Sequence, residues 1–236
     1  MPRIAFLGAG PMSLARRAPS VYENPQDFSR VVSDPSVDAV CIGGPVSSRA
    51  RWTAAACEAG KDVYVETPCC LSLDEAEQMV RTARRHSRIV QIGTVGRSGL
   101  LYRTARRIVR SGELGAITYC RISDPESLDL IQYIFDNEVQ PVPARSPHSY
   151  RYPTFVVACE DVQTGASFHG SAASLRVDRN ACRIFPGGIV VEVSPAHDPA
   201  EEHWNNWLSC IRTRTLPVSD IATSVYNRRH GDRMGS

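Results

Sequence analysis

The sequence has no hydrophobic run long enough to cross a bilayer and no excess of charge of one sign. A transmembrane helix needs about 18 consecutive apolar residues, and no stretch of this chain reaches that length. The formal net charge is +2, which gives no reason to expect a nucleic-acid or membrane-surface partner. The N-terminus lacks the charged, apolar and small-residue order of a signal peptide. The sequence therefore predicts a cytoplasmic protein without membrane or nucleic-acid partners.

The eight cysteines form neither a C-x-x-C motif nor a Cys/His pair with zinc-finger spacing. They are scattered among apolar neighbours, so we expect most to be small buried side chains in a reducing compartment. The vicinal pair Cys69-Cys70 leaves open a metal or redox role. No metal site is predicted.

The N-terminal segment is an apolar strand, from about Arg3, that runs directly into a glycine-rich turn. Gly8 permits a tight turn, Gly10 lets a pyrophosphate approach the backbone, and Ser13 takes the place of the third glycine of G-x-G-x-x-G. A helix that follows such a turn offers N–H donors to an anion. This arrangement indicates a dinucleotide-binding βα unit.

Strand-like and helix-like segments alternate through the first half of the chain. Apolar runs at 38–44, 62–66 and 88–93 are typical of buried parallel strands. Helical periodicity occupies 47–59 and the stretch from about 72 to 86, where Ser72 and Glu75 form a capping-box pattern. This order predicts an α/β fold that begins with an abbreviated, Rossmann-like parallel sheet.

After a helix at 100–111, the alternation of helices and strands gives way to a series of short strands with few helices between them. Strand-like segments separated by glycine or proline turns are expected at 116–122, 154–160, 166–169, 174–177 and 189–193. A proline-rich loop is expected at 140–153, and a helix with buried tryptophans at 201–213. We therefore expect two domains: a Rossmann-like dinucleotide-binding domain at 1–115, and a smaller α+β domain with a mostly antiparallel sheet at 116–236, for substrate binding and dimerisation.

Several blocks of the chain share their order and spacing with one family. The most specific is Glu58-Ala-Gly-Lys-Asp-Val-Tyr-Val-Glu-Thr-Pro68; others lie at 34–42, 91–98, 108–115, 174–179 and 203–212. In these blocks the chain resembles the Gfo/Idh/MocA oxidoreductases. The resemblance implies a domain that binds NAD or NADP and a second domain that binds a small-molecule substrate. It also implies hydride transfer to or from a sugar, polyol or related carbinol.

The resemblance assigns cofactor contacts position by position, with glycines at the pyrophosphate and Glu66 on the nicotinamide side. The implied cofactor-binding residues are Gly8, Gly10, Pro11, Met12, Gly44, Pro45, Glu66 and Pro68. Relatives often pair through the open face of the C-terminal sheet, so the resemblance also implies a possible homo-oligomer.

Two departures from the family pattern concern catalysis. The family's Glu-Lys-Pro is Glu66-Thr67-Pro68 here, and threonine cannot supply the charge with which a lysine polarises a reacting oxygen. The family's Asp-x-x-x-His motif also has no counterpart. Asp124 and Glu126 could form a substitute acid–base pair, or Asp124-Pro125-Glu126 could simply cap the following helix, which we favour. The candidate catalytic residues are Thr67, Asp124 and Glu126.

A third departure is architectural. Only 27 residues separate Gly10 from Asp38, whereas a βαβ unit needs about 30. Residues 30–34 could form the second strand, with Asp34 as the acid that holds the ribose; the family register instead places Asp34-Pro35 in a loop, which we favour. Two functional hypotheses stay open, an active NAD(P)-dependent oxidoreductase and a catalytically inactive nucleotide-binding relative. A third is a shortened gene product with an impaired fold.

Overall fold

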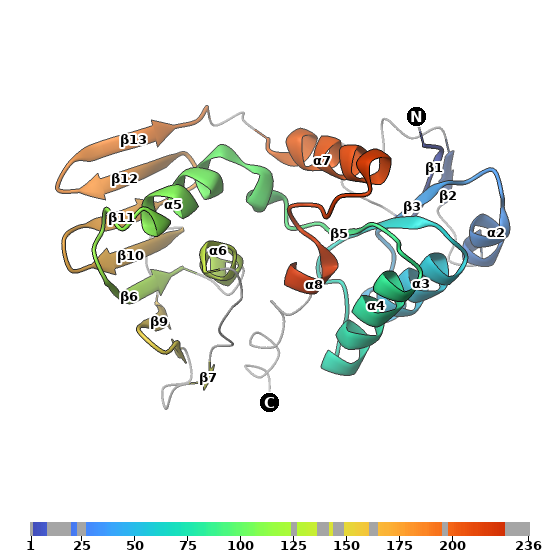
Figure 1. Ribbon diagram of the computed structural model, residues 1–236, viewed down its shortest axis with the longest axis horizontal. Coiled ribbons are helices and arrows are strands. Elements are labelled where there is room, and N and C mark those ends of the chain that lie inside the picture. Colours follow the sequence, from blue (N-terminus) through green and yellow to red (C-terminus); the bar gives the residue numbers. More distant parts are fainter. Residues whose placement is uncertain are drawn as a thin grey trace. The chain divides into compact units, whose positions relative to one another are not determined.

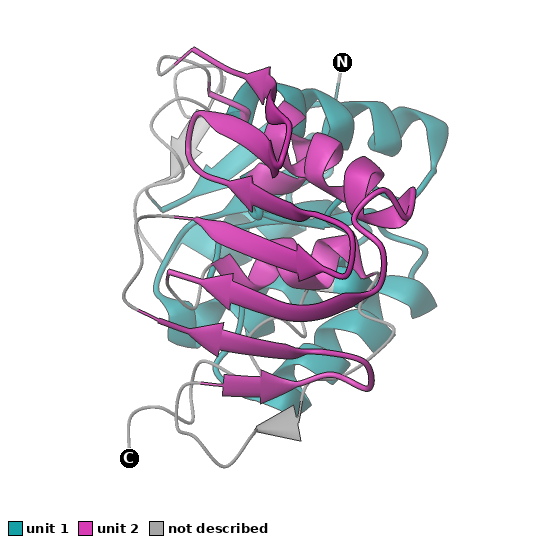
Figure 2. Ribbon diagram, turned by 90° about the vertical axis from the view of Figure 1, so that its left-hand side faces the viewer, with its two compact units in different colours: residues 1–95, 200–229 teal, residues 96–199, 230–236 magenta. Residues whose placement is uncertain are grey.

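The computed structural model describes residues 2–8, 20–22, 27–123, 127–135, 142–143, 149–160, 165–194 and 198–224. The chain forms two compact units, shown in different colours in Figure 2. Unit 1 comprises residues 1–95 and 200–229, and unit 2 comprises residues 96–199 and 230–236.

Unit 1 is built on a five-stranded sheet in which every pairing is parallel, as the sequence predicts. Its order is β2-β1-β3-β4-β5. The strands are β1 (Ile4–Leu7), β2 (Ser20–Tyr22), β3 (Ala39–Ile42), β4 (Asp62–Val65) and β5 (Val90–Ile92). Every residue of β1, β3, β4 and β5 is buried, because helices cover both faces of a parallel sheet.

Helices α3 (Val46–Glu58) and α4 (Leu73–Arg85) cover one face of this sheet, and α7 (Ala200–Thr213) covers the other (Figure 1). Smaller helices are α2 (Phe28–Ser33) and α8 (Ile221–Ser224). The expected capping box forms, with Glu75 N donating to Ser72 Oγ at 3.2 Å. The expected tryptophan stripe of α7 is also confirmed, since Trp204 and Trp207 pack on Phe6 and Tyr64.

The second strand of the sheet is β2, and it precedes the segment for which the sequence offered two interpretations. Residues 28–33 are helical, so the interpretation of residues 30–34 as the second strand is wrong. Asp34 follows that helix in a turn, where its Oδ1 accepts the Ser36 N–H at 2.7 Å. Asp34 therefore does not directly follow β2, which is where the ribose-binding acid is expected. Glu23, which follows β2 in the sequence, lies outside the described residues.

Unit 2 is built on an eight-stranded sheet of order β13-β12-β11-β10-β6-β9-β8-β7, with β6 and β9 parallel and all other neighbours antiparallel. The mostly antiparallel sheet is thus confirmed. Its strands are β6 (Ile117–Ile122), β7 (Val142–Pro143), β8 (Ser149–Arg151), β9 (Val156–Cys159), β10 (Ala166–Gly170), β11 (Ser174–Val177), β12 (Ala181–Phe185) and β13 (Gly188–Glu192). Strand β12 was not expected, and β7 and β8 lie in the segment expected to be loop.

Helices α5 (Leu100–Arg110) and α6 (Leu128–Ile134) pack on one face of this second sheet. A short 3-10 helix, η2 (Val95–Ser98), precedes α5. Figure 2 looks onto the other face, which we call the open face, with the helices of unit 2 behind the strands. Helix α5 packs on this second sheet, and α7 packs on the first. The units therefore divide after residue 95 and again before residue 200, whereas the sequence predicts one division at residue 115.

A buried ion pair joins η2 to α6 inside unit 2. Arg97 has a side-chain exposure of 2%, and its Nη2 donates to Asp129 Oδ1 at 2.7 Å. Its Nε donates to the same carboxylate at 3.0 Å. The guanidinium also lies 5.6 Å from the centre of the Tyr133 ring. This contact fixes the start of α5 against α6.

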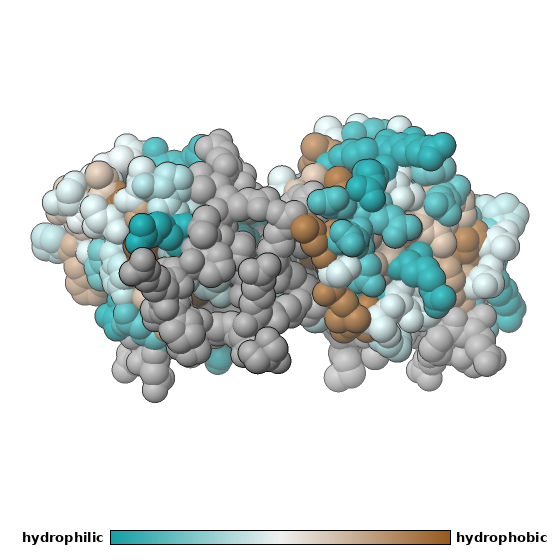
Figure 3. Space-filling model, turned by 90° about the horizontal axis from the view of Figure 1, so that it is seen from below, coloured by the Kyte–Doolittle hydropathy of each residue, from teal (hydrophilic) through white to brown (hydrophobic). Residues whose placement is uncertain are grey.

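On the face drawn in Figure 3, hydrophobic residues are scattered among hydrophilic ones. Scattered apolar side chains are ordinary on a protein surface and need no special explanation. Within the ranges that the structure describes, no helix combines the length and apolar character needed to span a bilayer.

Candidate functional site

The carboxyl ends of four parallel strands bring the predicted cofactor residues to one edge of the first sheet. The register pairs Leu7 with Ile42, Ile42 with Val65, and Val65 with Ile92. The residues that follow these positions are Gly8, Gly43, Glu66 and Gly93. In open α/β sheets, ligands bind beyond this edge.

Gly8 lies against Gly44, where the loops after β1 and β3 meet. Gly8 has φ +81°, and a Cβ placed on it would come within 2.8 Å of both Gly44 Cα and Gly44 N. A Cβ on Gly44 would lie 2.6 Å from the Trp52 ring, which stacks on Phe28 at 5.1 Å. Both positions therefore require glycine, which lets the loops after β1 and β3 pack closely on each other and on Trp52.

Arg49 on α3 holds the loops after β3 and β4 together. Its Nε donates to Gly44 O at 2.7 Å, and its Nη2 to Gly43 O at 3.3 Å. Its Nη1 donates to Glu66 O at 3.2 Å and to Pro68 O at 2.9 Å. The sequence interpretation missed Arg49. The signal available was its position one helical turn after Pro45.

The Glu66 carboxyl group is largely buried between β4 and β5. A Cβ on Gly93 would lie 2.8 Å from Glu66 Oε2 and 3.3 Å from the Tyr64 hydroxyl, so glycine makes room for both groups. Burial raises the pKa of Glu66 to about 7, although the Arg49 guanidinium opposes the shift. Among the described residues, none forms a hydrogen bond with Glu66 Oε1 or with the Tyr64 hydroxyl.

Thr67 is exposed beside this carboxyl group, and Pro68 closes the loop through a cis peptide bond. The sequence contains one lysine, Lys61, at the opposite end of β4. Its Nζ donates to Asp34 O and Val37 O, both at 2.7 Å. Lys61 therefore stabilises a turn remote from Thr67 and cannot replace the missing lysine of the family motif.

The remaining predicted site residues lie outside the described residues. These are Gly10, Pro11, Met12, Asp124 and Glu126. Pro45 lies at the start of α3 and Gly44 directly before it.

The cysteines match the expectation of buried small side chains, since seven are buried and Cys159 is half-buried. Cys69 Sγ and Cys70 Sγ lie 3.9 Å apart. In the part of the chain that the structure describes, no group of three or more His, Cys, Asp or Glu is arranged to hold a metal ion.

His203 on α7 is a buried structural residue. Its Nε2 lies 3.0 Å from Ile92 O, while its own carbonyl accepts Gln91 Nε2 at 2.9 Å. The ring meets Tyr64 edge-on at 5.8 Å. These contacts hold α7 against β5, close to the carboxyl end of that strand.

Comparisons with known proteins match both units. Residues 4–94 match the model of the GFO_IDH_MocA oxidoreductase family, NAD-binding Rossmann fold. The scyllo-inositol 2-dehydrogenase (NAD(+)) of Bacillus subtilis is 34% identical over 94 residues, which are 40% of this chain and 28% of that protein. An uncharacterized oxidoreductase of the same organism is 31% identical over 102 residues, 42% of this chain and 30% of that protein. The chain thus matches less than a third of the length of these curated relatives.

Solved structures cover almost the whole chain. An aldose-aldose oxidoreductase from Caulobacter crescentus, complexed with glycerol, has a TM-score of 0.74 at 18% identity and covers 98% of this chain and 88% of its own. An inositol dehydrogenase homolog from Azotobacter vinelandii, complexed with NAD+, has a TM-score of 0.71 at 16% identity, covering 98% and 94%. The motifs, the fold and the family match agree that residues 4–94 form an NAD-binding Rossmann domain of the Gfo/Idh/MocA oxidoreductase family.

Proposed function

We propose that this protein is an NAD(P)-dependent oxidoreductase that acts on a carbinol of a sugar or polyol. The observation that carries the proposal is the edge of the first sheet. There Gly8, Gly44 and Glu66 meet at the carboxyl ends of adjacent strands, inside the segment that matches the family's NAD-binding domain. The names of the relatives, which include inositol dehydrogenases and an aldose-aldose oxidoreductase, support a sugar or polyol substrate.

The residues at this edge fit a dinucleotide. Gly8 and Gly44 let the loops after β1 and β3 pack backbone to backbone, which is the tight glycine turn that a pyrophosphate-binding loop needs. Arg49 fixes the two loops by four hydrogen bonds to carbonyl groups, so the edge is preorganised. Glu66 has a buried oxygen without a hydrogen-bond partner among the described residues. A bound nicotinamide would supply the hydride chemistry, and a polar group of that ring is a suitable partner for the oxygen.

Glu66 is the group at this edge best suited to exchange a proton near neutral pH. A general acid or base works best when its pKa lies near the operating pH, and burial raises the pKa of Glu66 to about 7. We infer that Glu66 takes part of the role that lysine has in the family motif, while the Thr67 hydroxyl binds the substrate oxygen. A strongly perturbed carboxyl group at a ligand-binding edge supports this assignment.

Cofactor binding is tested by titrating the protein with NADH and with NADPH. Trp52 contacts Gly44, so bound reduced cofactor is expected to quench tryptophan emission and to show energy transfer. A W52F variant is expected to lose most of this signal without losing affinity, measured by calorimetry. No binding of either cofactor to folded protein would refute the proposal.

Turnover is tested separately with myo-inositol, scyllo-inositol, glucose and 1,5-anhydrofructose. Reduction of NAD+ or oxidation of NADH with at least one of them is expected. Binding of cofactor without turnover of any sugar or polyol would instead establish the inactive nucleotide-binding relative.

A homo-oligomer through the open face of the second sheet is also proposed. The support is a group of exposed apolar side chains on its last two strands: Phe185 is 51%, Ile189 58% and Val190 41% exposed. Light scattering is expected to show a dimer, and an I189E/V190E variant is expected to shift it to monomer. An unchanged mass for the variant would contradict pairing through these strands.

A further inference from the structure

Tyr64 and Glu66 project from the same side of the first sheet. Tyr64 lies in β4, and Glu66 extends the ladder by one residue, since its N–H donates to Ile42 O at 3.0 Å. Side chains two residues apart in a strand lie on one side of the sheet. The Tyr64 ring packs on Trp204 and Trp207, so this is the side that α7 covers. The phenol and the carboxyl group are therefore neighbours on this side.

The missing side chain of Gly93 brings these two groups to one small space. Gly93 follows β5, and its N–H donates to Val65 O at 2.8 Å, so it lies beside Glu66 in the register. The point where a Cβ of Gly93 would lie is 2.8 Å from Glu66 Oε2 and 3.3 Å from the Tyr64 hydroxyl oxygen. The hydroxyl group and the carboxyl oxygen thus flank the same space.

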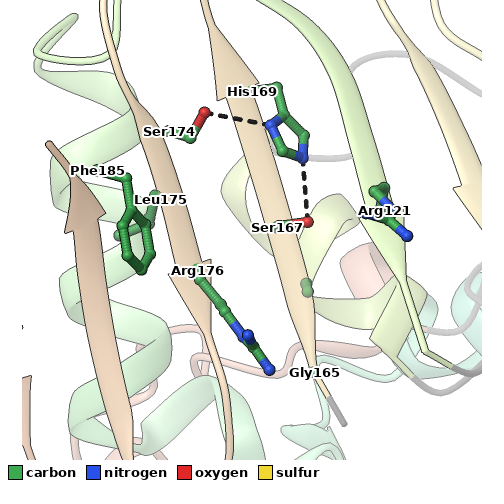
Figure 4. Close-up of a pocket in the computed structure, with 9 residues that line it drawn as sticks. Arg121, Gly165, Ser167, His169, Ser174, Leu175, Arg176 and Phe185 are labelled. Atoms are coloured by element: carbon green, nitrogen blue, oxygen red, sulfur yellow. Dashed lines mark hydrogen bonds between the residues drawn. The ribbon is translucent and has the colours of Figure 1, made fainter. Parts of the chain in front are cut away.

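The Tyr64 hydroxyl is a buried group with no hydrogen-bond partner among the described residues. Buried polar groups in folded proteins are nearly always paired, either with the protein or with ordered water. The second sheet follows this rule, because the two ring nitrogens of His169 each lie 3.2 Å from a serine hydroxyl, of Ser167 and of Ser174 (Figure 4). The position of the Tyr64 hydroxyl therefore calls for an acceptor close to Gly93.

Gln91 offers a second acceptor near the Tyr64 ring, since the two residues pair in register. Its Nε2 donates to His203 O at 2.9 Å, and its Oε1 has no partner among the described residues. The Tyr64 hydroxyl, however, lies beside Gly93, which is two residues beyond Gln91. The phenol thus leans along the strand toward Glu66, and Glu66 Oε2 is the acceptor that faces it.

We propose that Tyr64 is a positioning residue for Glu66, and that its hydroxyl donates to Glu66 Oε2, directly or through one buried water molecule, when the carboxyl group is ionised. A water that bridges two polar groups serves nearly as well as a direct hydrogen bond. Burial, with a smaller effect of Glu66, raises the pKa of Tyr64, so the phenol stays protonated and acts as a donor. The contact leaves Glu66 Oε1 for the cofactor. Its catalytic value rests on the proposed role of Glu66 in proton exchange.

The contact opposes the effect of burial on Glu66. A hydrogen bond donated to a carboxylate favours its ionised form, whereas burial raises the pKa of Glu66. Other titratable groups packed near Glu66 are Arg49 on α3, Cys41 on β3 and His203 on α7. Arg49 lowers the pKa of Glu66, and burial raises the pKa of the Cys41 thiol, which is uncharged at pH 7. Tyr64 therefore helps to keep Glu66 able to ionise near neutral pH.

The test is an NMR titration of the Glu66 carboxyl carbon in the whole protein without cofactor, with the signal assigned by its absence in E66Q. The Y64F variant keeps the ring and removes the donor, so the pKa of Glu66 should rise by about 1. G93A, which places a methyl group between the two oxygens, should change it in the same direction. The Y119F control removes a hydroxyl that binds Glu160 in the second sheet and should leave the Glu66 titration unchanged.

Stability gives a second measurement. Y64F should lose stability relative to wild type as pH rises through 7, because only the ionised carboxyl group accepts the bond. If the hydroxyl has no partner, Y64F should instead be more stable than wild type at every pH, and that result, or an unchanged pKa of Glu66 in Y64F, would overturn the proposal.

Neither measurement requires turnover, so the two proposals can fail separately. A raised pKa of Glu66 in Y64F without turnover of any sugar or polyol would support the contact and count against the proposed oxidoreductase activity. In an active enzyme, the pH profile of kcat/KM should move to higher pH in Y64F by the same amount as the pKa of Glu66. Turnover with the same pH profile in wild type and Y64F would overturn the positioning role and leave the activity standing.

Discussion

The Gly8 backbone rests directly on Gly44, so that a Cβ at position 8 would lie 2.8 Å from the Gly44 Cα. We expect G8A to lower the free energy of unfolding by about 2–4 kcal/mol, because left-handed backbone strain and a backbone clash combine. NADH affinity is expected to fall at least tenfold. Denaturant unfolding and NADH titration measure the two effects.

Gly60 provides the control for backbone strain alone. It has φ +78°, and a Cβ there would meet nothing within 4 Å. We expect G60A to cost about 1 kcal/mol and to leave NADH affinity unchanged. Equal effects of G8A and G60A on NADH binding would show that the contact with Gly44 has no role in the cofactor site.

Arg49 is expected to set the geometry of the site by its hydrogen bonds to four carbonyl groups. The R49K variant keeps the charge but loses the planar guanidinium fork. We expect it to weaken NADH binding at least tenfold and to lower stability by about 1–3 kcal/mol. R51A, which removes an exposed arginine of the same helix, should change neither. Wild-type NADH affinity in R49K would contradict the positioning role.

The raised pKa of Glu66 leads us to expect a specific pH dependence of the free energy of unfolding. Its pKa is about 7 in the folded protein against 4.5 for the free side chain, so between these values the folded state binds more protons. The contribution of Glu66 to stability is therefore complete below pH 4.5 and declines as pH rises through 7. We expect E66Q to gain stability relative to wild type as pH rises, by up to about 3 kcal/mol at pH 8.

Thermal unfolding of both proteins from about pH 5 to pH 8 measures this difference. E58Q, at an exposed position at the end of α3, is the control. The difference in stability between E58Q and wild type should stay constant over this pH range. A constant difference between E66Q and wild type across the range would show that Glu66 titrates normally.

Restoring lysine at position 67 tests the role of the missing charge. Thr67 is exposed, so a longer side chain fits without disturbing the core. If the proposed turnover is slow because this group is missing, T67K should raise kcat by about 10²-fold or more. KM should change less than kcat. A steady-state assay with the best substrate of the wild type decides this, and an unchanged or lower kcat would argue that Glu66 already supplies the proton.

The buried pair of Arg97 and Asp129 is expected to dominate the stability of unit 2. D129N would leave the guanidinium, 2% exposed, without its carboxylate. Removing one partner of a buried pair costs about 3–5 kcal/mol. R97M/D129L, which removes both charges, should recover much of that loss. Hydrogen exchange of β6 and α6 amides reports the effect locally, and a D129N protein as stable as R97M/D129L would contradict it.

Much of unit 1 could be predicted from the sequence, because its signals are local. The apolar runs that form β3, β4 and β5 have the length and composition of buried strands. Ser72 and Glu75 form a cap between residues three positions apart. The position of α7 could not be predicted in this way, because the contact of Trp207 with Tyr64 joins residues far apart in the sequence.

In the candidate site, too, local motifs could be predicted but contacts between distant segments could not. The glycines and Glu66 stand in recognisable motifs, whereas Arg49 acts through carbonyl groups of loops that only the fold brings together. The cross-strand neighbours Arg121, Ser167 and Arg176 of the second sheet were missed for a similar reason. Arg121 and Arg176 are more than 50 residues apart in the chain, and only the strand order β6-β10-β11 makes them neighbours.

Helix α7 follows the second unit in the sequence but packs in the first unit. This order has a consequence for synthesis on the ribosome. Residues 1–95 emerge first, but the face of their sheet that carries Phe6, Cys41 and Tyr64 is covered by Trp204 and Trp207. Until about residue 213 has left the exit tunnel, that apolar face has no partner within unit 1. Co-translational maturation of the nucleotide domain must therefore wait until the whole second unit has been made. A truncated product that ends near residue 115 should be a substrate for chaperones and proteases rather than a free-standing domain.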